Sequence, residues 1–193
     1  GVKHTLEGSP YAFTMIELFD LFTANDWFPD SHPPMPEVVA RGRKPDVRAC
    51  GMCHYPNGQG RPENSALAGL TANYIVQQVK DLQSGARRSS SPQIGPQLRM
   101  RSTAQHVSDE ELNTAAAYFA SMKYRPWIKV IETDRVPFTQ VVIGSMWAVV
   151  PGDATEPIGH RIIEVPTDYR RTELRDPRSG FTAYVPVGSI ARG

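Results

Sequence analysis

The sequence predicts a mainly α-helical domain followed by a small β-rich module. Two segments in the middle of the 193-residue chain repeat apolar residues at helical spacing, whereas the last third holds short β-branched and aromatic runs separated by turns. These patterns indicate an N-terminal extension over 1–40 with little regular structure, a helical domain over 41–124 and a β-rich module over 125–193. The boundary between the helical domain and the β-rich module lies where the helical spacing of apolar residues ends and the β-branched and aromatic runs begin.

The composition fits a globular chain. It is 40% hydrophobic and 21% charged, which supplies enough apolar material for a core. The net charge of +1 gives no indication of a nucleic acid or a membrane surface as partner. No apolar run reaches the roughly 18–20 residues of a membrane-spanning helix. Because the chain begins with Gly1 and shows no signal-like stretch, we expect a processed N-terminus.

Two helices are expected in the middle of the chain. The first, "ANYIVQQVKDLQSG", ends at Gly85, a residue that favours a helix C-terminus. The second, "SDEELNTAAAYFASMK", opens with a capping box formed by Ser108 and Glu111. Between them, "ARRSSSPQIGPQLRMRSTAQHV" reads as a long polar loop, and loops of this length inside a domain are usually functional.

The stretch "VRACGMCHYPNGQGRP" contains the only cysteines of the chain, Cys50 and Cys53, followed directly by His54. A structural zinc site needs four ligands, and no further cysteine is present. A redox pair of the thioredoxin type belongs in a βαβ unit, and a disulfide across two residues closes too small a loop to stabilise much. Cys-x-x-Cys-His is the spacing of covalent haem attachment, in which both thiols form thioethers and the imidazole binds the iron.

The sequence around this motif resembles the small class I bacterial c-type cytochromes. The matching elements, over 49–122, are "ACGMCHYPNGQGRP", "ALAGLTANYIVQQVKDLQSGARR", a loop methionine and "SDEELNTAAAYFASMK". The resemblance implies a mainly α cytochrome c fold around one covalently bound haem c. It also implies that Cys50 and Cys53 are the attachment points, and that His54 is the proximal iron ligand.

In this family a methionine from the loop before the last helix binds the distal face of the haem. The resemblance therefore implies Met100 as the distal ligand, a few residues before the capping box. His106 is its competitor and would give two histidine ligands, which lowers the reduction potential relative to a histidine and a methionine. The other methionines lie before the motif, inside it, on the apolar face of the last helix or in the β-rich module: Met15, Met35, Met52, Met122 and Met146.

Further site residues follow from the resemblance. A metal-bound histidine normally donates its second N–H to an oxygen, and the carbonyl of Pro62 is the candidate acceptor for His54. Apolar residues at helical spacing are candidates for the haem pocket, although such residues would form a core in any helical protein: Leu67, Leu70, Tyr74, Ile75, Leu82 and Leu98.

Basic residues outnumber acidic ones between Arg41 and Gln105, while the rest of the chain carries an acidic excess. Some of these arginines could neutralise the haem propionates. Alternatively, they could form a positive rim around the haem edge that attracts an acidic redox partner. Both interpretations remain open from the sequence.

The resemblance implies a periplasmic electron-transfer protein rather than an enzyme, since a haem with two protein ligands has no open position for a substrate. Its partners would be a donor dehydrogenase and an acceptor cytochrome or oxidase, with no nucleic acid and no membrane span. An open-site haem enzyme or sensor is the competing class. A further hypothesis rests on "VGSIARG", which resembles the approach to a haem motif. The native protein would then continue as a larger di-haem cytochrome or as a subunit of an oxidoreductase complex.

Overall fold

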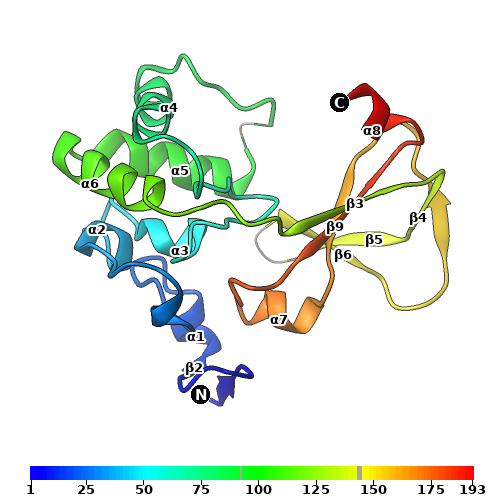
Figure 1. Ribbon diagram of the computed structural model, residues 1–193, viewed down its shortest axis with the longest axis horizontal. Helices are drawn as coiled ribbons and strands as arrows, with labels where there is room; N and C mark the ends of the chain where they lie inside the picture. Colours follow the sequence, from blue (N-terminus) through cyan, green and yellow to red (C-terminus); the bar gives the residue numbers. More distant parts are fainter. Residues whose placement is uncertain (92, 143–144) are drawn as a thin grey trace. The chain divides into compact units, whose positions relative to one another are not determined.

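The chain divides between Arg125 and Pro126 into two units, Gly1–Arg125 and Pro126–Gly193, in a computed structural model (Figure 1). The structure describes residues 1–91, 93–142 and 145–193. Pro92, in the loop expected between the two long helices, lies outside the described residues, as do Ile143 and Gly144 in the expected strand region.

The first unit begins with short elements. Strands β1 and β2 form an antiparallel hairpin in which His4 pairs with Phe13, and the following helix starts with a capping box between Thr14 and Glu17. The elements of this segment are three or four residues long: β1 (Lys3–Thr5), β2 (Ala12–Thr14), α1 (Met15–Leu18), η1 (Pro29–Ser31) and α2 (Glu37–Ala40).

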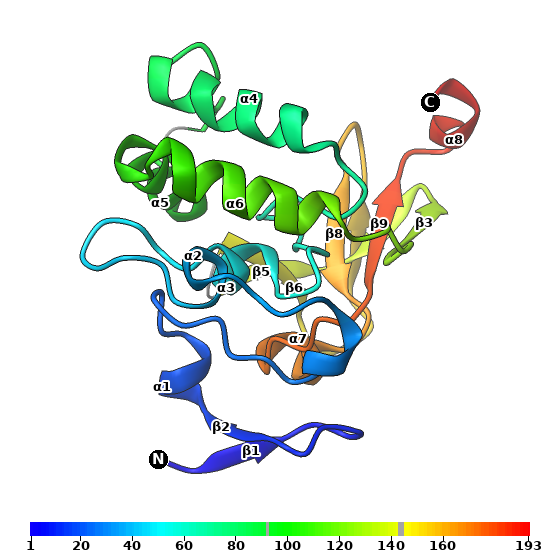
Figure 2. The same ribbon diagram turned by 60° about the vertical axis from the view of Figure 1, so that its left-hand side comes forward.

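Four further helices complete the first unit: α3 (Cys50–His54), α4 (Ala72–Ser84), α5 (Gly95–His106) and α6 (Asp109–Ala120). Helix α4 packs against both α5 and α6 (Figure 2). The predicted stop of α4 is confirmed, because Gly85 adopts a left-handed conformation with φ 79°. The predicted capping box of α6 between Ser108 and Glu111 is also confirmed.

The prediction of a loop over 86–107 is wrong for its second half, which forms helix α5. Pro96 lies in the first turn of this helix, where its missing N–H has no carbonyl to bond and its fixed φ suits the helix. Ala104 is its one fully buried residue among those described, so the helix lacks the apolar stripe by which a sequence pattern reveals a helix.

Two apolar clusters form the core of the first unit. The larger one joins α2, α4 and α6 and consists of Val38, Val39, Val47, Ile75, Ala115, Ala116, Tyr118 and Phe119. The smaller one joins α4, α5 and α6 and consists of Val79, Leu82, Ala104 and Leu112. Alanines on α6 allow the helices to approach closely, and the two clusters together hold α4 and α6 in place around α3 and α5.

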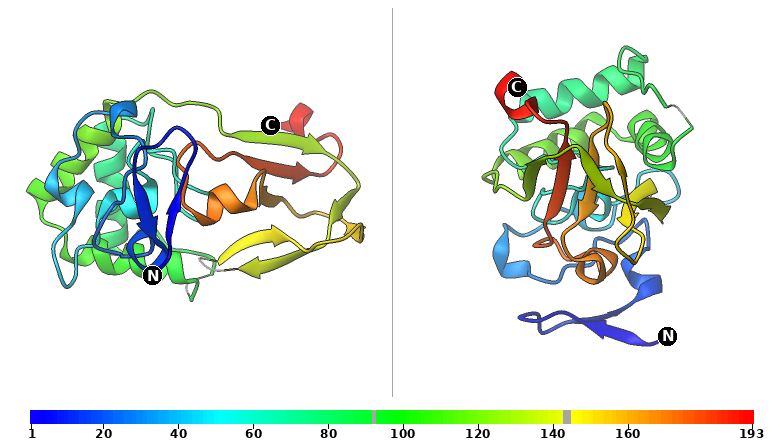
Figure 3. Two further views of the ribbon diagram at one scale, coloured as in Figure 1. Left: turned by 90° about the horizontal axis from the view of Figure 1, so that it is seen from below. Right: turned by 90° about the vertical axis from the view of Figure 1, so that its right-hand side faces the viewer.

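The second unit contains the predicted β-rich module. Strand β9 is the centre of a three-stranded sheet, parallel to β3 and antiparallel to β8 (Figure 3). Two antiparallel pairs, β4–β7 and β5–β6, complete the strands. The elements are β3 (Ile128–Glu132), β4 (Arg135–Pro137), β5 (Thr139–Val142), β6 (Met146–Val149), β7 (Thr155–Pro157), β8 (Ile163–Pro166), α7 (Tyr169–Glu173), β9 (Phe181–Val185) and α8 (Ser189–Arg192).

A buried carboxylate organises the turn after α7. Asp176 is fully buried and accepts hydrogen bonds from Nε and Nη2 of Arg171, at 2.7 Å and 2.6 Å. The backbone N–H of Arg178 donates to the same carboxylate at 2.9 Å. Beside it, the buried hydroxyls of Thr172 and Ser179 lie 2.7 Å apart. This polar cluster ties α7 to the start of β9.

Candidate functional site

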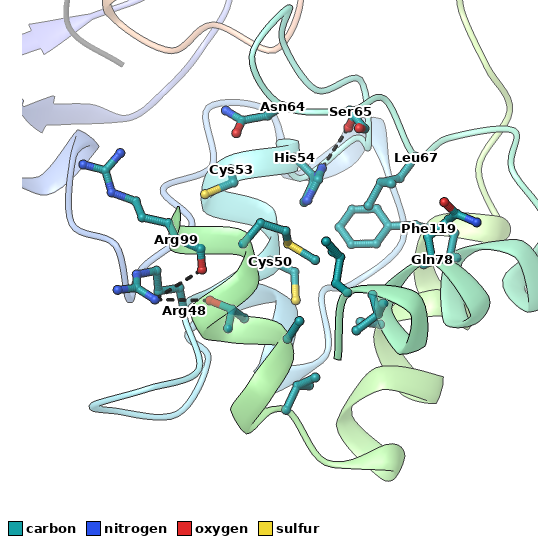
Figure 4. Close-up of a pocket in the computed structure, with 18 of the residues that line it drawn as sticks. Arg48, Cys50, Cys53, His54, Asn64, Ser65, Leu67, Gln78, Arg99 and Phe119 are labelled. Atoms are coloured by element: carbon teal, nitrogen blue, oxygen red, sulfur yellow. Dashed lines mark hydrogen bonds between the residues drawn. The ribbon is translucent and has the colours of Figure 1, made fainter. Parts of the chain in front are cut away.

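Helix α3 holds the two cysteines and the histidine on little more than one turn. Residues from the N-terminal segment pack directly behind it: a methyl group on Gly51 would lie 3.0 Å from both the Cβ of Ala24 and the carbonyl oxygen of Val39. A larger residue at this position of the motif would have to push these neighbours back by a few tenths of an ångström. The close packing turns the opposite face of α3, with Cys50 and Cys53, toward a cavity (Figure 4).

The cavity has a volume of about 300 Å³ and is lined by residues of α3, α4, α5 and α6 together with the segment after the motif. It brings together nine of the residues that the sequence singles out: Cys50, Cys53, His54, Leu67, Leu70, Tyr74, Ile75, Leu82 and Met100. Leu98 and Pro62 are not among the described residues that line this cavity. Leu98 is 45% exposed, and Tyr74 lines the cavity while 50% exposed.

His54 is held by the segment that follows it. Its Nδ1 lies 2.8 Å from the carbonyl oxygen of Ser65, which fixes the ring and leaves Nε2 available to bind a metal (Figure 4). The predicted acceptor, Pro62, is wrong. Arg61 and Asn64 exchange backbone hydrogen bonds of 2.7 Å and 2.9 Å, and this tight turn contains Pro62, so that the first carbonyl beyond it, that of Ser65, reaches His54.

The protonation state of His54 suits a metal ligand. Burial lowers the pKa of His54, with the hydrogen bond to Ser65 acting in the opposite direction, so the ring is neutral at pH 7. The edge of this ring faces Phe119, with 6.2 Å between the ring centroids. Burial and the neighbouring Cys53 raise the pKa of the Cys50 thiol to about 12. A thiol with so high a pKa is a poor nucleophile, which does not suit a redox pair.

Met100 reaches the cavity from α5 and packs against the smaller core cluster. His106, the competing ligand, is exposed at the end of the same helix and is not among the cavity-lining residues that the structure describes. Its Nδ1 lies 2.8 Å from the carbonyl oxygen of Ser102, one turn earlier. The geometry therefore places a thioether sulfur, and not a second imidazole, in the cavity with His54.

Arginines line part of the cavity. Arg48 donates from Nη1 to the hydroxyls of Ser102 and Thr103, both at 3.3 Å, and so ties the residue before the motif to α5. Arg87 and Arg99 are exposed and lie at the same cavity. These guanidinium groups can pair with the carboxylates of a bound group or of a partner protein.

Sequence reasoning missed three residues of the site. The acceptor role of Ser65 depends on the path of the backbone and leaves no side-chain signal. Phe119, on α6, carries no sequence signal that separates a site residue from a core residue. Arg48 carries a usable signal, since it is a basic residue two positions before the first cysteine of the motif. Taken together, two thiols, an imidazole, a thioether and an apolar lining form a donor set that fits an iron porphyrin.

Comparisons with known proteins agree with this site. A model of the cytochrome c family matches residues 39–123. Cytochrome c4 of Azotobacter vinelandii is 34% identical over 76 residues, which are 38% of this chain and 36% of that protein. Cytochrome c-554(548) of Halomonas halodenitrificans is 31% identical over 78 residues, which are 40% of this chain and 88% of that protein.

A third relative is the thiosulfate dehydrogenase electron acceptor of Stutzerimonas stutzeri, 35% identical over 83 residues, which are 42% of this chain and 35% of that protein. The chain thus spans little more than a third of the length of the cytochrome c4 relative that it matches. In the described part of the chain, no helix is long and apolar enough to cross a membrane.

Proposed function

Because this chain belongs to the cytochrome c family, we propose that it carries electrons by means of one covalently bound haem c, held by Cys50, Cys53, His54 and Met100. The family's cofactor is a haem attached through the two cysteines of a Cys-x-x-Cys pair, and this chain has that pair. The observation that carries the proposal is that one apolar cavity collects both thiols, the imidazole and the thioether.

Each residue has a distinct role in this proposal. Cys50 and Cys53 would hold the haem covalently, since their S–H groups can add across its two vinyl groups with no atom lost. His54 would bind the iron through Nε2, with its ring oriented by the Ser65 carbonyl, and Met100 would supply a second, thioether ligand. The bound haem supplies a reversible one-electron couple of its iron.

The chain's own residues favour a carrier over an enzyme. With His54 and Met100 as its two ligands, the iron would have no open position for a substrate, and Leu67, Leu70 and Ile75 give the cavity part of its apolar lining. Arg48 is suited to pair with the carboxylates of the haem, because it is half-buried at the cavity and anchored on α5. Arg87 and Arg99 are exposed, and we assign them to the attraction of an acidic partner surface.

The optical spectrum of the haem-loaded chain tests the ligand assignment. The oxidised protein is expected to show a weak near-infrared band of a methionine–iron bond, and Met100→Ala is expected to abolish it. His106→Ala and Met122→Leu serve as matched controls and should leave the band unchanged. Loss of the band in His106→Ala, or carbon monoxide binding to the unmodified reduced protein, would overturn the assignment and favour the open-site class.

We further propose a periplasmic location and a dehydrogenase as electron donor. Covalent haem attachment of this type takes place on the outer side of the bacterial inner membrane, and one relative is named as the electron acceptor of thiosulfate dehydrogenase. The second unit lies outside the residues that the family model matches, which suits a section of a larger electron-transfer protein. Reduction of the haem-loaded chain by a purified dehydrogenase, measured at low and high salt, tests this role.

A further inference from the structure

A row of polar groups runs from the N-terminal segment to the loop that follows the proximal histidine. Oδ2 of Asp26 lies 3.0 Å from Nε2 of His32, and Nδ1 of the same ring lies 2.9 Å from the hydroxyl of Tyr118. That hydroxyl lies 2.6 Å from the carbonyl oxygen of Pro56, two residues after His54. Asp26 and His32 precede the residues that the family model matches, whereas Tyr118 belongs to α6.

The partners of the His32 ring define its protonation. The carboxylate of Asp26 faces Nε2, and the carbonyl oxygen of Pro33 lies 2.8 Å from Nδ1. Both groups can only accept hydrogen bonds. Since Tyr118 spends its one proton on Pro56, its oxygen can also only accept at Nδ1. These surroundings favour an imidazolium, whose Nε2 forms an ion pair with Asp26 without a hydrogen bond of regular geometry and whose single N–H at Nδ1 is shared between the oxygens of Pro33 and Tyr118.

The side chain of His32 is 3% exposed and that of Asp26 is 15% exposed, so water does not compete strongly for these bonds. Burial opposes the charge of His32, but the contacts of its ring nitrogens with the acceptor oxygens of Asp26 and Pro33 and the charge of Asp26 outweigh it and raise the pKa of the ring. Among the described residues, the ionisable side chains that contact this ring are Asp26, on the segment before η1, and Tyr118, on α6.

Loss of one proton changes the row in a defined way. Because the carboxylate of Asp26 holds the proton at Nε2, the nitrogen that loses its proton is Nδ1. Its lone pair then faces the hydroxyl of Tyr118 at a distance that already suits a hydrogen bond. Rotation of the O–H bond then transfers the hydrogen bond from Pro56 to His32, and the carbonyl of Pro33, which faced the lost N–H at 2.8 Å, moves away from Nδ1. The carbonyl of Pro56 is then left without this donor.

We propose that His32 and Tyr118 form a proton-driven switch on the proximal side of the haem, in which the protonation state of His32 decides whether Tyr118 holds the loop after His54 and thereby sets the reduction potential. This inference rests on the proposed function, because it needs a haem at His54. Tyr118 acts as a positioning residue, and His32 acts through it.

The direction of the effect follows from charge. Deprotonation of His32 removes a positive charge from the proximal side and frees the negative end of the Pro56 carbonyl dipole. Both changes favour the ferric form, which carries one more positive charge than the ferrous form. The reduction potential therefore falls as the pH rises through the pKa of His32, which lies above the ordinary histidine value of about 6.5. A tenfold difference in proton affinity between the two forms corresponds to about 59 mV.

The experiment measures the reduction potential of the haem-loaded chain against pH. The reduction potential of the unmodified chain should fall as the pH rises from about 6 to about 9. This range includes the values above the ordinary histidine pKa, toward which the pKa of His32 is shifted. His32→Gln should abolish this slope, and Tyr118→Phe should reduce it by half or more while it keeps the ring packed on Phe119. His160→Gln and Tyr169→Phe change exposed residues of the second unit and should leave the slope intact.

A full slope in either His32→Gln or Tyr118→Phe would overturn the switch, because the slope would then come from another group. A second readout does not depend on the redox couple. The 13C chemical shift of the Pro56 carbonyl should titrate with the His32 ring in the unmodified chain and stay constant in Tyr118→Phe. A carbonyl that titrates in that variant contradicts the switch. A chain that takes up no haem under cytochrome c maturation contradicts the proposed function instead.

Discussion

Both units of the molecule bury carboxylates beside cationic side chains; besides Glu63 with Arg61, the first unit holds Asp26 with His32, and this pair differs from Asp176 with Arg171 of the second unit in which partner is enclosed. In the first unit Asp26 pairs with His32, whose side chain is only 3% exposed. In the second unit Asp176 is completely buried and pairs with Arg171, whose side chain is 43% exposed. A guanidinium stays charged across the physiological pH range, whereas an imidazole does not.

The two pairs therefore serve different ends. The Asp176 cluster is built of a buried acceptor and donors that do not titrate near neutral pH, so it acts as a permanent tie between α7 and β9. The Asp26–His32 pair contains an imidazole, which can gain or lose a proton near neutral pH. The pair lies next to the hydroxyl of Tyr118, which can change its hydrogen-bond partner. A similar pairing is thus structural in one unit and responsive in the other.

The largest effect is expected from Asp176→Ala, which breaks the permanent tie. It leaves Arg171 and the N–H of Arg178 without their acceptor and should destabilise the second unit by about 3 kcal/mol. Thermal unfolding followed by tryptophan fluorescence and by the haem spectrum measures this. The matched control is Arg170→Ala, which removes an exposed ion pair with Glu173 of 3.7 Å and should cost less than about 1 kcal/mol. Equal losses in the two variants would contradict a structural role for Asp176.

The second effect is a pH dependence confined to the first unit. Because folding raises the pKa of His32, the pair contributes its full stabilisation below about pH 6.5 and loses it as the pH rises through the folded pKa. A rise of one pH unit in the pKa of His32 corresponds to about 1.4 kcal/mol of unfolding free energy. Urea unfolding at a series of pH values checks the sign. His32→Gln should flatten this dependence, and a stability that rises with pH over the same range would refute it.

The smallest effect compares one helix cap in each unit. The side chain of Ser108 accepts from the N–H of Glu111 at the start of α6, and that of Asp168 accepts from the N–H of Arg171 at the start of α7. Ser108→Ala and Asp168→Ala should each cost about 1 kcal/mol. Since the two helices belong to different units, each variant should shift the unfolding of its own unit alone in a two-probe melt. A common shift of both transitions would show that the units unfold together.

The sequence predicts the local part of the site well. The spacing of Cys50, Cys53 and His54 depends on consecutive residues, and the capping box at Ser108 needs only four. The assignment of Met100 rests on the family resemblance, which expects a ligand in the segment before that box; the segment is helical rather than a loop, and Met100 lies at the cavity. Such features depend on neighbours in sequence, which a pattern can read.

Long-range placement could not be predicted. The contact between His32 and Tyr118 joins residues 86 positions apart, and neither residue carries a periodic or motif signal. The carbonyl that orients His54 depends on the turn at Arg61 and Asn64, because any residue offers a carbonyl and the backbone path decides which one arrives. Leu98 fails as a pocket residue since helix α5 turns it outward, at 45% exposure.

The close packing behind Gly51 has a practical consequence for the smallest chain that can hold the haem. The backbone N–H of Ala49 donates to the carbonyl of Leu21 at 3.0 Å, and that of Ala24 donates to Ala40 at 2.7 Å. A fragment cut to 39–123 would keep every residue of the family match and yet uncover the back of the motif helix. We therefore expect a chain that begins ahead of residue 21 to hold the motif helix more firmly than a fragment cut at the boundaries of the family match.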